Sequence, residues 1–146
     1  MAIGAIGAGA LALCLTSVGP QDAPLSAHIP FVHEARALSL EWTHSIEKTQ
    51  WLEHWEVVAA PQPHLRLLRA RIEASGAGME IPDNAVFRNG GYEYPVNQDL
   101  SSVTLSHSPF TAQAKLCVGE RCRPLADWLP GLPSISAVTL SACHAP

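Results

Sequence analysis

The sequence predicts an all-β protein, a single antiparallel β-sandwich or small barrel over residues 36–146 that follows an N-terminal apolar leader helix. Two observations carry this prediction. Downstream of the leader, apolar and polar residues alternate in short segments separated by turns rich in glycine, proline and asparagine. In the same region no helical periodicity is sustained, and the 146-residue length allows one ordinary domain.

Composition supports a packed domain and argues against one class of partner. Hydrophobic residues make up 47% of the chain and charged residues 15%, which is typical of a folded protein and not of a disordered one. The formal net charge is -4 at pH 7. A protein that binds nucleic acid needs a surplus of positive charge to neutralise phosphates, so we expect no nucleic-acid partner.

An uninterrupted run of apolar and small residues covers positions 2–18, and no charged side chain precedes Asp22. The run lies between the hydrophobic region of an export signal and a minimal membrane span of roughly 17–25 residues. Residues 1–21 are therefore expected to be a cleaved signal peptide or an uncleaved membrane anchor, with a linker over 22–35. A lipoprotein attached through Cys14 is less favoured, because a bulky leucine precedes that cysteine. All three interpretations export the rest of the chain.

The predicted strands begin after the linker. In residues 37–42 the apolar side chains share one face of an extended chain. Residues 51–58 alternate in the same way; Trp51 and Trp55 would also coincide on a helix, but the β-branched end of the segment favours a strand. The third strand covers 64–73, with an apolar side formed by Leu68, Ala70 and Ile72. Shorter segments follow at 101–107, 111–118, 121–124 and 134–142, with one helical turn between 124 and 128.

The cysteines agree with export. Cys117 and Cys122 flank Gly119-Glu120, which suits a two-residue hairpin turn with glycine first and places the cysteines opposite each other. The sequence therefore predicts a disulfide between Cys117 and Cys122. A metal-binding pair is less favoured, because no second cysteine pair lies nearby. Cys143 is left over, either as a free thiol or as an alternative partner for one of these two cysteines.

Two polar stretches form the candidate site: the segment 43–49 at the end of the first strand, and the glycine turn 75–78 after the third. We expect the two stretches to meet in space and to bind a small ligand or a partner protein. An anionic carboxylate would suit the two cations and the free backbone N–H groups of the turn. The candidate ligand- or partner-binding residues are His44, Ser45, Glu47, Lys48, Arg71, Gly76 and Gly78.

Other roles for the same residues stay open. His44 and Thr43 would in the simplest case hydrogen-bond the glycine turn and fix the strand ending, and Arg71 would pair across strands with Glu56 or Glu47. A hydrolase using His44, Ser45 and Glu47 is disfavoured, because neighbouring side chains of a strand point oppositely and no nucleophile elbow is visible. We therefore assign no catalytic residue. The seven histidines are scattered without ligand spacing, so no metal or cofactor is expected, although a metal-binding module remains an alternative.

One stretch of the chain resembles a known family. The block Trp-Thr-His-Ser-Ile-Glu-Lys-Thr at 42–49 is followed by an acidic and aromatic strand, then by Arg71 and by Ser-Gly-Ala-Gly at 75–78. This order resembles the family called domain of unknown function 1850, over roughly residues 36 to 125. The chain differs in carrying Ile46 where valine is commoner and Met79 where leucine is usual.

The resemblance implies a small exported bacterial protein of the kind often encoded beside tripartite ATP-independent periplasmic (TRAP) transporters of the TAXI type. It implies a non-enzymatic accessory role, with a transporter membrane subunit or the solute-binding protein as partner. The expected location is the periplasm, or the periplasmic side of the inner membrane if the leader stays attached. The family carries no established catalytic residue that could be transferred to this chain.

Overall fold

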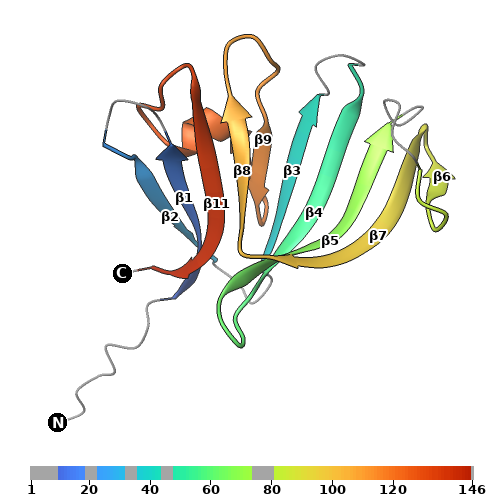
Figure 1. Cartoon of the computed structure of the whole chain (residues 1–146), viewed down its shortest axis with the longest axis horizontal. Coiled ribbons are helices and arrows are strands. Elements are labelled where there is room, and N and C mark those ends of the chain that lie inside the picture. The colour runs from blue at the N-terminus through green and yellow to red at the C-terminus, as the bar shows by residue number, and fades with distance from the viewer. Residues whose placement is uncertain (1–9, 19–22, 32–35, 44–47, 74–80, 146) are drawn as a thin grey trace.

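The computed structural model describes residues 10–18, 23–31, 36–43, 48–73 and 81–145. Most of these residues lie in strands (Figure 1). In chain order the elements are β1 (Leu11–Val18), β2 (Ser26–Pro30), β3 (Ala37–Thr43), β4 (Gln50–Val58), β5 (His64–Glu73), β6 (Val86–Arg88), β7 (Gly91–Leu100), β8 (Ser102–His107), β9 (Lys115–Val118), β10 (Arg121–Pro124), the short 3-10 helix η1 (Leu125–Trp128) and β11 (Ser136–His144).

The strands build two antiparallel sheets that pack as a sandwich. The four-stranded sheet has the order β2-β1-β11-β8, and the seven-stranded sheet has the order β10-β9-β3-β4-β5-β7-β6. A single residue, Ser101, separates β7 from β8, so the chain passes from one sheet to the other at a sharp corner (Figure 1). The all-β prediction is confirmed in its sandwich form, because the described strands do not close into a barrel.

Alternation along β3, β4 and β5 follows the predicted pattern, with one exception. Trp51 pairs with Trp42 of β3 and with Ile72 of β5, so the segment 51–58 is a strand, as predicted. The exception is Leu68, which has no partner in the register with β4 or β7. This bulge reverses the alternation, so the chain buries Leu67 on one side of it and Ala70 on the other, while Leu68 is only half-buried.

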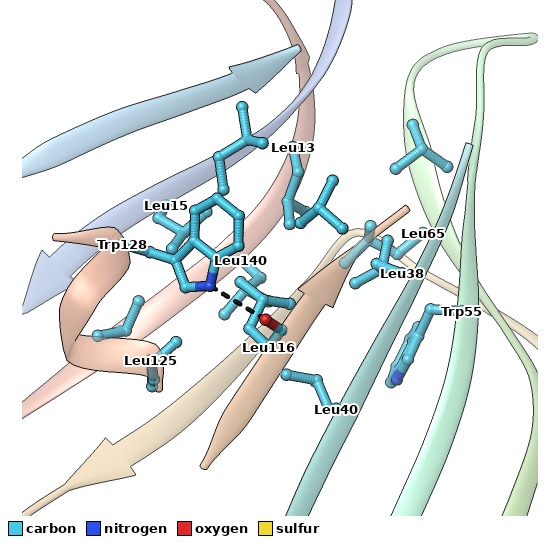
Figure 2. Packing of buried hydrophobic residues seen from close by; sticks show 14 of the residues in the cluster. Leu13, Leu15, Leu38, Leu40, Trp55, Leu65, Leu116, Leu125, Trp128 and Leu140 are labelled. Carbon is cyan, nitrogen blue, oxygen red and sulfur yellow. Dashed lines mark hydrogen bonds between the residues drawn. The ribbon is translucent and has the colours of Figure 1, made fainter. Parts of the chain in front are cut away.

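The core lies between the two sheets and consists mainly of leucine. Figure 2 shows Leu13, Leu15 and Leu140 of the four-stranded sheet facing Leu38, Leu40 and Leu116 of the seven-stranded sheet, and all six are buried. Trp128 of η1 closes one side of this cluster, and its indole N–H donates to the backbone oxygen of Leu116 at 3.1 Å. A buried aromatic ring with its polar atom satisfied contributes a large apolar area to the core at little cost.

The N-terminal region differs from the expectation. Residues 11–18 form β1, an inner strand between β2 and β11, and not a helix (Figure 1). Ser26–Pro30, within the segment expected to be a linker, forms β2. The physical reason is that an uninterrupted apolar run has no period, so a strand buried on both faces and an apolar helix look alike in sequence. Ala12, Leu13, Cys14 and Leu15 are all buried.

No helix in the described part of the chain combines the length and the apolar character needed to cross a bilayer.

Two disulfides connect the strands. Cys117 and Cys122 face each other in the β9–β10 hairpin and are bonded, with Cα atoms 4.0 Å apart, which confirms the predicted pair. Cys143, which the sequence left without an assignment, is bonded to Cys14, with Cα atoms 6.0 Å apart. That bond joins the first strand to the last across 129 residues of sequence. Disulfides are typical of an oxidising, extracytoplasmic compartment.

Candidate functional site

The predicted binding residues fall into two groups. His44, Ser45, Glu47, Gly76 and Gly78 lie outside the described residues, so their proposed roles stay predictions. Lys48 and Arg71 are described. Thr43 pairs with Gln50, and the next pair on β4 joins Trp51 to Ile72, so β3 ends, β4 begins and β5 ends at the same end of the sheet.

Arg71 donates hydrogen bonds to the β6–β7 hairpin. Its guanidinium donates to the backbone oxygens of Arg88 and Asn89 at 2.9 and 2.7 Å, and to the Glu93 carboxylate at 3.2 Å. The turn between the strands, Asn89-Gly90, has positive φ at both residues, as a tight hairpin turn requires. A Cβ atom at Gly91 would lie 2.7 Å from the guanidinium carbon, so only glycine leaves room for the arginine there.

This geometry gives Arg71 a partner other than Glu56, while Glu47, the second partner considered in the sequence, lies outside the described residues. Its carboxylate partner is Glu93 on β7, whereas Glu56 lies 3.6 Å from Arg66. The neighbouring depression has a volume of only about 100 Å³ and is lined by Glu41, Gln50, Leu52, Arg71 and Glu73. Its two glutamates oppose the binding of an anion. We call the contacts of Arg71 with the β6–β7 hairpin the hairpin lock.

The inner face of the seven-stranded sheet carries a row of large side chains beyond the core. Trp42, Trp51, Ile72 and Tyr92 are successive cross-strand partners on β3, β4, β5 and β7. Trp42 and Trp51 stack with ring centroids 6.0 Å apart, and Tyr92 meets Phe87 edge to face at 5.0 Å. Of these five, Ile72 is buried, the two tryptophans and Tyr92 are half-buried, and Phe87 is exposed. We call these five residues the aromatic row.

A carboxylic acid lies beside the aromatic row. Glu53 pairs with Leu40 on one side and with Ala70 on the other, and both of those side chains are buried against the core. Burial raises the pKa of Glu53, and the nearby Trp55 indole N–H partly opposes the shift. Burial also raises the pKa of Tyr94 on the next strand, and the charge of Glu53 adds to that effect. Glu53 was not predicted as a site residue. The sequence does place it on the same face of the strand as Trp51 and Trp55, and a carboxylate between two tryptophans could have indicated it.

A larger pocket, of about 370 Å³, opens between the two sheets next to Trp42. Its walls come from the end of β3, from β8, and from the connection between β8 and β9. We call it the β8 cleft; it is lined by Trp42, Thr43, Thr104, Leu105, Ser106, Thr111, Ala112 and Ala114. None of these residues is charged, and Trp42 belongs to both the cleft and the aromatic row. The lining offers hydroxyls and apolar side chains, which suit an uncharged ligand.

One group of described residues has the composition of a metal site. Cys14, His28 and Cys143 place one ligand atom each within 4.8 Å of one another on the four-stranded sheet. The two sulfurs are joined in the disulfide, which removes both thiolates that a metal would need.

The hairpin lock predicts that Arg71→Ala destabilises the fold. Removing a charged donor from three acceptors should lower the free energy of unfolding by about 1–3 kcal/mol, measured by urea unfolding. Arg69→Ala, an exposed arginine on the same strand, should change it by less than about 0.5 kcal/mol. Equal stability of the two variants would contradict the lock.

The raised pKa of Glu53 predicts that the difference in stability between wild type and Glu53→Gln depends on pH. Because its pKa is raised in the folded state, the folded protein keeps a proton that the unfolded chain has already lost just above the ordinary value of 4.5. The Glu53 carboxyl should therefore make a contribution to wild type that reduces stability as the pH rises from 4.5 through the raised pKa, and Glu53→Gln lacks this contribution.

Thermal unfolding between about pH 4 and pH 8 measures this difference. The advantage of Glu53→Gln over wild type should grow across that range and then level off. Glu73→Gln, which removes an exposed carboxylate at the end of β5, is the control. A constant difference between Glu53→Gln and wild type would contradict a raised pKa of Glu53.

Comparison with known proteins identifies one family. Residues 38–125, more than half of the chain, match the model of the family described as domain of unknown function (DUF1850). No curated protein and no solved structure matches the chain. The match runs from β3 through β10 and thus includes β8 and every strand of the seven-stranded sheet, but not β1, β2 or β11. The chain belongs to the DUF1850 family.

Proposed function

We propose that the protein is an exported, non-enzymatic accessory component of a TAXI-type TRAP transporter system, and that it binds a transporter subunit through the β8 cleft. The observation that carries the binding role is the cleft itself, an uncharged pocket of about 370 Å³ that is continuous with the aromatic row. Clefts of this size with a mainly apolar lining are the usual binding sites of proteins.

Two further points support the setting. The Cys14–Cys143 and Cys117–Cys122 disulfides are stable in an oxidising compartment, which fits the periplasm or the periplasmic side of the inner membrane. The block at 42–49 that carries the family resemblance includes Trp42 and Thr43, and these two residues line the β8 cleft. The transporter itself enters this proposal through the resemblance alone.

A small anionic ligand at Lys48 and Arg71 has less support. The Arg71 guanidinium is already committed to two backbone oxygens and to Glu93. A ligand there would have to replace these contacts in a depression that also contains Glu41 and Glu73. We therefore prefer a protein partner at the β8 cleft.

The proposal predicts that the affinity-tagged full chain co-purifies with the transporter membrane subunits or with the solute-binding protein after mild crosslinking and detergent extraction. Ala112→Glu places bulk and charge at an exposed position of the cleft and should reduce the recovery of partner at least tenfold. The matched control is Ala59→Glu, the same change at an exposed position just after β4, at the opposite end of the seven-stranded sheet. Absence of any transporter component from the wild-type sample would contradict the accessory role.

A further inference from the structure

The edges of the two sheets are protected unequally. A free strand edge exposes unpaired N–H and C=O groups, and proteins usually protect such edges with proline, charge or shortness. The edge strand β10 has the sequence Arg-Cys-Arg-Pro, and β6 has only three residues and ends in Arg88. The edge strand β2 ends at Pro30, whose backbone oxygen accepts a hydrogen bond from Arg121 at 3.5 Å.

The fourth edge strand, β8, has none of these protections. Its sequence, Ser-Val-Thr-Leu-Ser-His, contains no proline, lysine, arginine or acidic residue, and it is the longest of the four edge strands. Within the described residues β8 pairs with β11 and with no other strand. Among the residues that the structure describes, one side of the β8 backbone therefore has no strand partner.

The β8 cleft runs along this unpaired side. Thr104, Leu105 and Ser106 are consecutive, so their side chains point alternately to the two faces of the sheet. Residues from both faces of a strand border one pocket where that pocket reaches the strand edge, and this supports a cleft along the edge of β8. The opposite wall is formed by Trp42, Thr43 and the connection 111–114.

Exposed apolar side chains gather at one end of β8. Phe110, which follows β8, is 84% exposed, and Ile135, which precedes β11, is 62% exposed. Val18, 55% exposed, lies at the same end, because Val18 pairs with Ala137 and Ser136 pairs with His107. Exposed apolar side chains that gather at one end of a sheet are candidates for an interaction site. An uncharged cleft that leads to an apolar end favours an uncharged, partly apolar occupant.

We propose that β8 is a docking strand: an extended, uncharged segment of the partner, alternating aliphatic residues with serine or threonine, pairs with its free edge as the fifth strand of that sheet. This inference rests on the proposed function for the identity of the partner. The alternation follows from the sheet itself, where Val138 and Leu140 of β11 face the core while Thr139 bonds Thr104 on the outside at 2.9 Å. A strand added beside β8 would continue both surfaces.

The test uses a peptide that carries this pattern. A fluorescently labelled, end-capped copy of residues 135–142 (Ile-Ser-Ala-Val-Thr-Leu-Ser-Ala) is titrated with the full chain, and binding is followed by anisotropy. Two further peptides carry N-methyl groups on alternate amides, one at odd positions and one at even positions. Successive N–H groups of a strand point to opposite sides, so one methylated peptide should bind at least tenfold more weakly and the other should match the parent.

The outcomes separate the possibilities. Equal binding of both methylated peptides would overturn strand pairing, and so would unchanged binding to Ala112→Glu, with Ala59→Glu as the control. A wild-type dimer in sedimentation that Ala112→Glu abolishes would make a second copy of this chain the occupant and would also overturn the proposal. Failure of the peptide together with recovery of a transporter component would reject the docking strand and leave the accessory role intact; the reverse result would reject the transporter and keep the docking strand.

Discussion

The antiparallel pairing of β1 with β11 holds the first and last strands of the chain together, and the four-stranded sheet depends on it. The pairing runs the full length of β1, from Leu11 opposite His144 to Val18 opposite Ala137. Leu13 and Leu15 project from it into the core, and Cys14 is bonded to Cys143. A crosslink across so much sequence restricts the unfolded chain strongly and is typically worth several kcal/mol. Without this pair β8 would have no sheet to border, and the cleft would lose one wall.

The unequal size of the two sheets creates the binding surface. Four strands cannot cover the inner face of seven, so beyond the core Trp42, Trp51 and Tyr92 stay only half-buried. That part of the larger sheet carries the aromatic row and Glu53. Burial raises the pKa of Glu53. At the sharp corner of Ser101 the chain passes to β8 in the other sheet, and residues of β8 line the cleft. The unequal number of strands in the two sheets therefore accounts for both the half-buried part of the larger sheet and the cleft beside it.

Much of the fold could be predicted from local sequence patterns, and the remainder depends on contacts between distant segments. The alternation of β3 and β4 and the Cys117–Cys122 pair are local features, and the structure agrees with both predictions. The strand β7 was not predicted. The strand β1 was read as a leader helix because a strand buried on both faces has no alternation. The Cys14–Cys143 bond could not be inferred, because it requires β1 to be part of the domain. The bulge at Leu68 changes which residues of β5 face the core, and it could not be predicted because nothing in the local sequence marks it.

The candidate site shows the same limit. Arg71 was predicted as a binding residue or as the cross-strand partner of a glutamate, but it donates to backbone oxygens of the β6–β7 hairpin, which the sequence did not connect with it. Thr104 and Leu105 were not predicted as site residues, because an unpaired strand edge depends on the order of strands in the sheet and not on composition.

The central claim, that the first strand is bound to the last within the folded domain, is tested most directly by disulfide mapping. Mass spectrometry of the unreduced protein, isolated from the expressing cell with free thiols blocked, should find peptides linking Cys14 to Cys143 and Cys117 to Cys122. A protein that begins downstream of Cys14, or a bond from Cys143 to either of the other two cysteines, would contradict it.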